Sequence, residues 1–292
     1  MRPLPSFSLH RPETLRKALE LLQSLEGARA IAGGTDLLIL LRDGAIQAKH
    51  LVDLGQVGEL RYIREADDAI RVGSMTTHSQ LIRSELIATK ASVLRESAMS
   101  TGSPQTRSRG TVGGNLCNAS PAADTAPPLL VLDAKATISS LEETRSIPLA
   151  DLFAGPKINS LRPDELLTEI TFRAPTANSG ASFHKLGRRQ SMTLAVVNAA
   201  AYLTLDGDLC KEAKVALGSV APTPLRMPPV EERLEGKKLS QRLINEAASE
   251  CRDLVDPVDD VRASAEYRRD MACVLTRRAL TDAWKRARGD LP

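Results

Sequence analysis

Two short stretches of paired glycines constrain this chain more than any other feature of its sequence. The first, AGGTD, begins at Ala32 after a short apolar segment, and the second, TVGGN, begins at Thr111. Glycine adopts positive φ easily and lets a ligand approach the main chain closely. Successive N–H groups in such a loop form a concavity that favours an anion, typically a phosphate. The pair therefore predicts two loops that hold a pyrophosphate, and the alternative for each is a tight turn that needs glycine for steric reasons alone.

Neither stretch matches the common nucleotide-binding signatures. The chain has no G-x-G-x-x-G after a strand and no G-x-x-x-x-G-K-[ST]. A standard Rossmann or Walker site is therefore not indicated. Downstream of the second stretch, Asp124 and Thr125 stand where a helix N-cap is expected, with Pro127 and Pro128 in the first turn. The second glycine loop is thus expected to lead through a polar turn into a short helix.

The overall composition excludes several other classes of site. With 292 residues, 42% of them hydrophobic, the chain is long enough for two domains or one large domain with subdivisions. A net charge of +3 and 3% aromatic residues argue against a nucleic-acid partner. Neither the cysteines nor the histidines show metal-ligand spacing, so no metal site is predicted. The chain lacks a long apolar run and an apolar signal core, which predicts a cytoplasmic protein without a membrane span.

Hydrophobic periodicity predicts a chain of mixed α and β structure. The first unit is β-α-β-α-β over residues 1–54, with strands at 5–10, 28–32 and 50–53 and helices at 15–25 and 37–41. The second has strands at 62–64, 69–72, 136–140, 144–148 and 165–172, helices around Leu81 and at 91–99, and loops at 100–110 and 151–156. A shift in composition at 174–180 predicts a linker. The last part is expected to contain antiparallel strands at 181–186, 196–205 and 209–216, a loop at 221–229, and helices at 240–254 and 262–288.

Two groups of basic residues allow more than one interpretation. Lys185, Arg188 and Arg189 follow a strand, and they form either a cation that reaches over the bound phosphates or a solvated turn. The last helix carries many basic residues between Arg268 and Arg288, and a solvated helix face is favoured over docking of a partner subunit. No Ser-His-Asp or Cys-His set can be assembled, so no catalytic residue is assigned. Any chemistry is expected to belong to a bound cofactor.

The two glycine stretches, extended to AGGTDLL and TVGGNLCNASPAADTAPPLL, resemble the flavin-binding subunit of molybdenum-containing hydroxylases. This family includes the flavin subunits of xanthine dehydrogenase and the medium chain of carbon monoxide dehydrogenase. Further matches are VGSMTTHSQL, DELLTEI, FHKLGRRQSM and SAEYRRDM, so the resemblance runs nearly end to end. It implies an α+β fold with a two-part FAD-binding domain of the vanillyl-alcohol-oxidase or p-cresol-methylhydroxylase type. A C-terminal domain with a small antiparallel sheet and helices follows. The corresponding division is residues 1–174, with subdomains of about 1–54 and 55–174, and residues 181–292.

The resemblance also implies a set of FAD-binding residues. The pyrophosphate would be held by the two glycine stretches, which comprise Ala32, Gly33, Gly34, Thr35, Asp36 and Leu37, and Thr111, Val112, Gly113, Gly114 and Asn115. Asp124 matches a residue on the ribose side of adenosine, and Leu166 falls near the adenine. Lys185 matches a lysine near the flavin, while Thr101 and Cys117 fall at positions that face the isoalloxazine. Animal xanthine dehydrogenases have a stacking aromatic at the position of Thr101, so the match does not imply NAD as the electron acceptor.

By the same resemblance, the chain is expected to bind FAD non-covalently and to carry electrons rather than hydroxylate a substrate. A large partner subunit with a molybdopterin cofactor would oxidise xanthine or another N-heterocycle, an aldehyde or carbon monoxide. A small partner with [2Fe–2S] clusters would relay the electrons to FAD, which passes them to NAD, a quinone or oxygen. The assembly would be a heterotrimer or its dimer. Two alternatives remain open: a nucleotide-binding or assembly subunit without FAD, and a stand-alone flavin oxidase with its own base.

Overall fold

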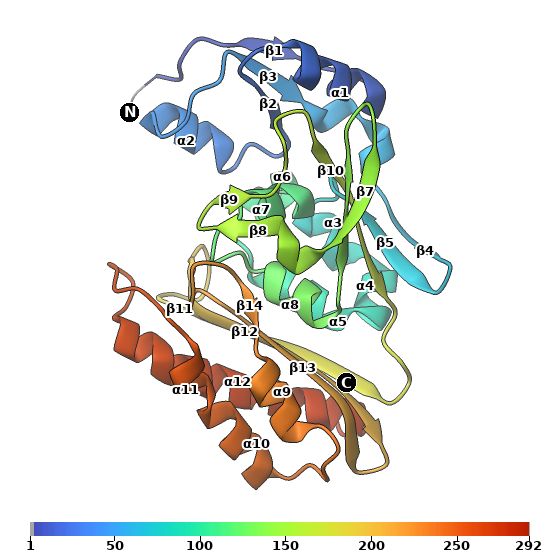
Figure 1. Ribbon diagram of the computed structural model, residues 1–292, viewed down its shortest axis with the longest axis vertical. Coiled ribbons are helices and arrows are strands. Elements are labelled where there is room, and N and C mark those ends of the chain that lie inside the picture. The colour runs from blue at the N-terminus through green and yellow to red at the C-terminus, as the bar shows by residue number, and fades with distance from the viewer. Residues whose placement is uncertain (1–2, 292) are drawn as a thin grey trace.

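Three sheets follow one another along the long axis of the molecule, in the order in which the chain forms them (Figure 1). The computed structural model describes residues 3–291. The first sheet is parallel, and the two larger ones are antiparallel. Within residues 3–291, no helix combines the length and apolar character needed to cross a bilayer.

The first sheet has strand order β1-β3-β2. Its elements in chain order are β1 Ser8–His10, α1 Leu15–Ser24, β2 Ala28–Ile31, α2 Leu37–Asp43 and β3 His50–Asp53. The predicted β-α-β-α-β order is therefore confirmed. Thr14 caps α1 by accepting a hydrogen bond from the Lys17 N–H. Gly44 ends α2 in the left-handed conformation that glycine tolerates.

The second sheet has strand order β4-β5-β10-β6-β7, and helices pack against it. The strands are β4 Ile63–Ala66, β5 Ala69–Gly73, β6 Lys135–Ser139, β7 Thr144–Pro148 and β10 Leu166–Arg173, with a separate hairpin of β8 Phe153–Gly155 and β9 Ile158–Asn159. The helices are α3 His78–Arg83, α4 Glu85–Lys90, α5 Ser92–Ser100, α6 Pro104–Arg109, α7 Val112–Cys117 and α8 Ala126–Val131. The loops predicted at 100–110 and 151–156 are wrong in part, because α6 and β8 occupy them.

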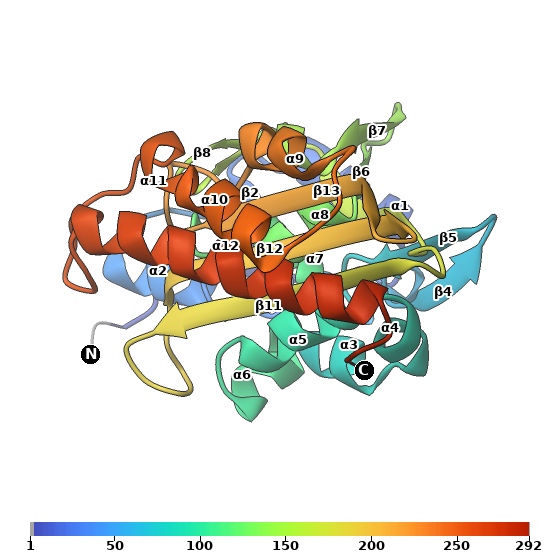
Figure 2. The same cartoon turned by 90° about the horizontal axis from the view of Figure 1, so that it is seen from below.

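The third sheet has strand order β11-β12-β13-β14, and α12 crosses it (Figure 2). Its strands are β11 Ser179–Gly187, β12 Ala195–Asp206, β13 Leu209–Gly218 and β14 Leu225–Arg226. Its helices are α9 Pro228–Leu234, α10 Gln241–Ser249, α11 Cys251–Leu254 and α12 Ala265–Ala287. The predicted loop at 221–229 is shorter than expected, since β14 and the start of α9 lie within it. The helix predicted at 240–254 is divided into α10 and α11.

Both faces of the third sheet are buried, which joins the last part of the chain to the second. Along β12, Val197, Ala199 and Ala201 pack in the cluster that contains α12. The alternate residues Ala200 and Tyr202 pack in the cluster of the second sheet and its helices. This arrangement follows from the period of two in a strand, and it explains why β12 reads as a nearly continuous apolar run.

Arg268 of α12 is a buried structural residue rather than part of a solvated helix face. Its Nη1 donates to the carbonyls of Val196 and Ser219, at 2.8 and 3.2 Å. Its Nη2 donates to Asp260 Oδ1 at 2.6 Å. Hydrogen bonds from Arg262 and the charge of Arg268 hold the pKa of Asp260 well below its usual range. The sequence-based expectation for this arginine was wrong because the helical spacing alone does not reveal which basic residue faces the sheet.

We expect Arg268→Met to lower the free energy of unfolding by about 3–5 kcal/mol, because it leaves the carbonyls of Val196 and Ser219 without this donor and breaks the ion pair with the partly exposed Asp260. The matched control is Arg269→Met on the same helix. The Arg269 guanidinium lies 3.8 Å from the exposed Asp256, so its removal should cost about 0–1 kcal/mol. Urea unfolding of the two variants measures the difference, and equal losses would contradict the structural role of Arg268.

Candidate functional site

The first glycine stretch contacts the segment that leads directly into the second, although more than seventy residues separate the two stretches along the chain. A Cβ on Gly33 would lie 2.1 Å from the carbonyl oxygen of Arg109 and 3.0 Å from Gly110 Cα. A Cβ on Gly114 would lie 3.8 Å from the Cβ of Ala32. The main chains thus meet at a separation that only glycine allows at position 33.

The first stretch presents unpaired donors. Gly34 has φ +73°, which turns the chain at the end of β2. Within residues 3–291, the N–H groups of residues 33–37 form no hydrogen bond with the protein. Asp36 stands at the N-cap of α2, but its carboxylate accepts no hydrogen bond from the first turn of the helix. Consecutive free N–H groups of this kind favour an anion.

The second stretch is helical, and its amides are already paired, which corrects the expected open loop. Thr111 caps α7, and its Oγ1 accepts from the Gly114 N–H at 3.0 Å. The N–H groups of Val112, Gly113 and Asn115 donate to the carbonyls of Thr76, Ser74 and Thr111. Gly113 is required because a Cβ there would lie 2.6 Å from Ser74 Cβ. Glycine is therefore needed at position 113 for steric reasons alone, as the alternative interpretation proposed. At Gly114, by contrast, no backbone atom of another segment lies close to the position of a Cβ.

Asn115 links the second stretch to the segment that carries Asp124. The Oδ1 atom of Asn115 accepts from Thr125 Oγ1 at 2.6 Å. Asp124 itself does not cap α8, since the residue at the cap position is Thr125 and no side chain caps this helix. The expected capping role of Asp124 is wrong because its carboxylate turns toward the third sheet instead.

Asp124 and Lys185 form a buried ion pair between the second and third parts of the chain. Their side chains are 8% and 7% exposed, and Nζ lies 2.6 Å from Oδ2. Lys185 Nζ also donates to the Ser100 carbonyl at 3.0 Å, next to Thr101. Asn198 Nδ2 donates to the other carboxylate oxygen at 3.1 Å. Burial raises the pKa of Asp124, and the nearby ammonium and amide oppose that rise.

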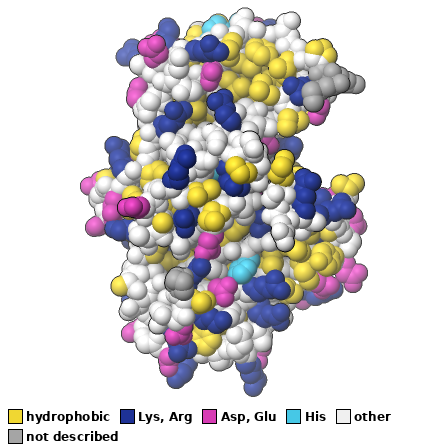
Figure 3. Space-filling model, turned by 180° about the vertical axis from the view of Figure 1, so that it is seen from behind, with side chains coloured by type: hydrophobic (Ala, Val, Ile, Leu, Met, Phe, Trp, Pro, Cys, Tyr) yellow, Lys and Arg dark blue, Asp and Glu magenta, His cyan; other side chains and the backbone are white. Residues whose placement is uncertain are grey.

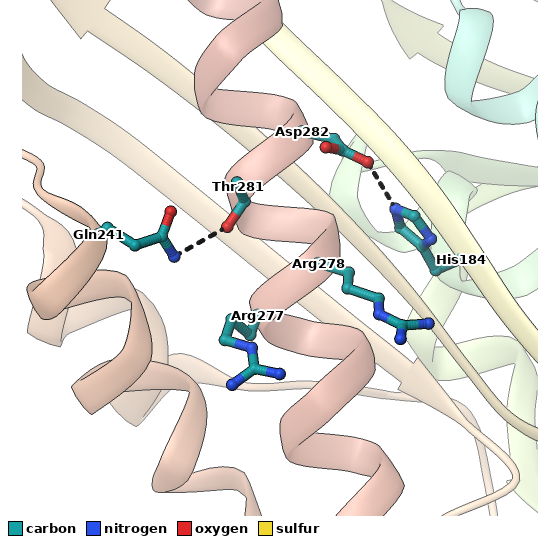
Figure 4. A pocket seen from close by; sticks show the side chains of 6 residues that line it. All are labelled: His184, Gln241, Arg277, Arg278, Thr281 and Asp282. Carbon is teal, nitrogen blue, oxygen red and sulfur yellow. Dashed lines mark hydrogen bonds and ion pairs between the residues drawn. The ribbon is translucent and has the colours of Figure 1, made fainter.

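Neighbouring residues on β11 point to opposite faces of the sheet, so only one of them belongs to this site. His184 Nε2 lies 2.9 Å from Asp282 on α12, in a surface hollow that Arg278 also lines (Figure 4). Lys185 points to the other face, toward Asp124. Arg188 and Arg189 stay in the exposed turn after β11, where they donate to the carbonyls of Val261 and Met192.

The remaining predicted residues lie at the edges of this arrangement. Leu166 is buried in the cluster of the first sheet, against which Ala32 also packs. Thr101 is half-buried, and its Oγ1 donates to the Ser97 carbonyl at 3.0 Å. Cys117 is half-buried at the end of α7, and burial raises the pKa of its thiol to about 12. Its carbonyl accepts from Asn159 Nδ2 at 2.7 Å.

The sequence analysis missed Asn198, which contacts Asp124 directly. A visible signal exists: Asn198 is the only strongly polar residue in the run AVVNAAAYL at 195–203. An amide within an apolar strand needs a partner. The contacts of the buried Thr125 hydroxyl with Asn115 and of the Ser100 carbonyl with Lys185 were also missed, because no sequence pattern shows which segments meet there.

Comparison with known proteins identifies the family. The family model described as the FAD binding domain in molybdopterin dehydrogenase matches residues 5–175. The model described as the CO dehydrogenase flavoprotein C-terminal domain matches residues 181–283. This chain belongs to the family of FAD-binding subunits of molybdopterin dehydrogenases. Membership makes it a flavoprotein subunit of the oxidoreductase class, as the resemblance implies.

Individual relatives support this membership over nearly the full length of the subunit. The carbon monoxide dehydrogenase medium chain of Afipia carboxidovorans is 35% identical over 284 residues, which cover 97% of this chain and 98% of that protein. A putative xanthine dehydrogenase FAD-binding subunit of Escherichia coli is 34% identical, with the same coverage. A solved carbon monoxide dehydrogenase chain from Hydrogenophaga pseudoflava has a TM-score of 0.94 at 31% identity, covering 97% of this chain and 99% of that chain. The expected α+β fold is thus confirmed.

We expect the stability of the subunit to depend on His78, which packs against Gly110 between the glycine stretches. The His78 ring is 2% exposed, and burial together with the charge of Arg107 lowers its pKa to about 4. The unfolded chain therefore binds a proton near pH 6.5 that the folded chain does not bind until about pH 4. The free energy of unfolding should fall by about 3 kcal/mol across this interval, at 1.36 kcal/mol for each unit of pKa.

Urea unfolding at pH 7.5 and pH 4 measures this loss. The variant His78→Asn has no imidazole to protonate, so it should lose about 3 kcal/mol less than the wild type over the same interval. The control His184→Asn removes the partly exposed ring that contacts Asp282 and should leave the contribution of His78 unchanged. An identical pH dependence in His78→Asn and the wild type would contradict the prediction.

Proposed function

We propose that this chain is the FAD-carrying electron-transfer subunit of a molybdenum hydroxylase, with residues 1–174 as the FAD-binding domain and 181–292 as the C-terminal domain. The observation that carries the proposal is the row of unpaired N–H groups at residues 33–37, which begins where Gly33 contacts the main chain of Arg109 and Gly110, just before the second glycine stretch. A buried lysine and carboxylate lie at the far end of the same connected set of residues.

The residues fit FAD in distinct ways. The free N–H groups of residues 33–37 would bind the pyrophosphate, and Gly114 would allow its close approach. The second stretch would contribute through the Thr111 hydroxyl and the side-chain amide of Asn115. Its backbone N–H groups at residues 112–115 are already paired within the protein. Each oxygen of Asp124 accepts one hydrogen bond, which leaves lone pairs for a hydroxyl of the ribityl chain. Its ion pair with Lys185 favours the flavin end for Asp124 over the adenosine ribose that the resemblance implies. Leu166 would pack near the adenine, and Lys185, Thr101 and Cys117 would lie at the flavin end.

Bound FAD supplies the chemistry that couples single-electron donors to a two-electron acceptor. This chain holds the cofactor, orients it and sets the electrostatics around it, so no residue is assigned as a general base. The proposed partners are a large molybdopterin subunit, which oxidises the substrate, and a small [2Fe–2S] subunit, which delivers electrons. The proposed assembly is a cytoplasmic heterotrimer or its dimer, and the acceptor is NAD, a quinone or oxygen.

The complex purified with its partners should contain FAD that is released by denaturation, and its flavin absorbance should bleach when the organic substrate is added without an acceptor. The chain purified alone should carry FAD yet not bleach with the same substrate, because substrate oxidation belongs to the large subunit. A colourless chain in the intact complex would support the nucleotide-binding alternative. Substrate turnover by the isolated chain would support a stand-alone oxidase.

We expect Gly33→Ala to lower the affinity for FAD at least tenfold, which corresponds to about 1.4 kcal/mol. The added Cβ would collide with the Arg109 carbonyl at 2.1 Å and push the two glycine stretches apart. The matched control is Gly58→Ala, where a Cβ meets nothing within 4 Å and φ is not positive. Flavin fluorescence during titration of the apoprotein measures both affinities. Equal affinities in the two variants would show that the contact at Gly33 does not shape the cofactor site.

A further inference from the structure

A row of three residues crosses the third sheet beneath the Asp124 carboxylate. Lys185 of β11 pairs with Asn198 of β12, and Asn198 pairs with Gly218 of β13. Asp124 belongs to the segment between α7 and α8, and it accepts hydrogen bonds from both side chains in this row. One carboxylate from the first half of the chain is thus held by adjacent strands of the second half.

Asn198 lowers the stability of the folded state at this position. It is fully buried, and its Oδ1 has no hydrogen-bond partner among the described residues. Oδ1 lies against Gly218, where a Cβ would come within 2.3 Å. A buried acceptor without a partner destabilises the folded state, so packing alone would favour an apolar side chain here. The hydrogen bond that the Asn198 side chain does make is the one to Asp124.

We infer that Asn198 is a positioning residue for Lys185, acting through Asp124, and that Gly218 provides the space for this arrangement. The inference rests on the proposed function, in which the Lys185 ammonium lies at the flavin end of FAD. The Asn198 amide donates to Oδ1 of Asp124, which prevents the carboxylate from rotating freely. The other oxygen, Oδ2 of Asp124, therefore holds Lys185 Nζ in one direction. The Ser100 carbonyl holds a second N–H of the same ammonium. Two of the three donors are then committed, and the direction of the third is determined.

The consequence concerns the reduction potential of the bound cofactor. Reduction adds negative charge to the flavin, and a fixed ammonium nearby stabilises that charge at no cost of reorganisation. Without Asn198, one oxygen of Asp124 loses its donor, the carboxylate reorients, and the ammonium moves with it. The reduced form of FAD then loses stabilisation, so the potential becomes more negative.

The first experiment measures the midpoint potential of FAD in the holoprotein. Asn198→Leu keeps the branching and the number of heavy atoms of the side chain, and it should change the ratio of oxidised to reduced FAD at a fixed potential at least tenfold, which is about 30 mV for a two-electron couple. The control Ser182→Ala removes a buried hydrogen bond from the same sheet, to the Ala279 carbonyl, on the face that packs against α12. A shift in Asn198→Leu no larger than in Ser182→Ala would overturn the inference.

The second experiment is a double-mutant cycle with Gly218→Ala. In the wild-type background the added Cβ displaces Asn198 from Asp124, so the potential should shift as it does in Asn198→Leu. In an Asn198→Ala background there is no amide to displace, and the added Cβ meets only the Pro121 carbonyl, at 3.0 Å, so Gly218→Ala should add a much smaller shift. Equal shifts in both backgrounds would show that Gly218 acts independently of Asn198.

A third measurement needs no FAD and separates this inference from the proposed function. The effects of Asn198→Leu and Lys185→Met on the urea midpoint of the apoprotein should be non-additive, because both residues act on Asp124. If the wild-type complex contains no FAD, the proposed function fails, while this coupling is still measured. If FAD is bound and the two effects add, the inference alone fails.

Discussion

The contact between Gly33 and the main chain of Arg109 and Gly110 is the constraint on which the candidate site depends. It brings the turn after β2 against the segment that leads into α7, and a side chain at position 33 would keep them apart. The same segment is fixed from its other side, where the His78 N–H donates to the Gly110 carbonyl. The parts of the chain that form the first and second sheets are therefore joined at a contact that involves main-chain atoms and no side chain of Gly33.

The two sides of this contact divide the work of anion binding unequally. The amides of the second stretch are paired with carbonyls and with the Thr111 hydroxyl, so this stretch is rigid before any ligand arrives. The amides of residues 33–37 are unpaired within the described part of the chain. The rigid second stretch lies next to unpaired N–H donors, and this arrangement suits a ligand that carries hydrogen-bond acceptors. Little reorganisation of the protein is needed when such a ligand binds.

The C-terminal part of the chain completes the site because its sheet is buried on both faces. One face of β12 packs under α12, and the other packs on the helices of the second part (Figure 2). Ion pairs such as Arg226 with Asp133 and Arg286 with Glu96 join the same two parts at the rim. Charged groups elsewhere are scattered: Figure 3 shows Lys and Arg side chains among acidic and uncharged ones over the face it displays. Inside the molecule, Asp124 and Lys185 form a buried ion pair, and Arg268 is buried at the other face of the third sheet.

The sequence by itself determined the order of the main strands and helices, the two glycine stretches and the family to which the chain belongs. These features are local or depend on runs of residue types, and period and turn chemistry encode them directly. Only the tertiary structure decided how the glycines are used. Whether Thr111–Asn115 forms an open loop or a capped helix depends on whether Ser74 and Thr76 lie close enough to accept its N–H groups. The partners of Asp124, the burial of Arg268 and the role of Asn198 were decided in the same way. Each depends on a contact between distant segments, and a single sequence records the residues that make such a contact without recording which of them meet.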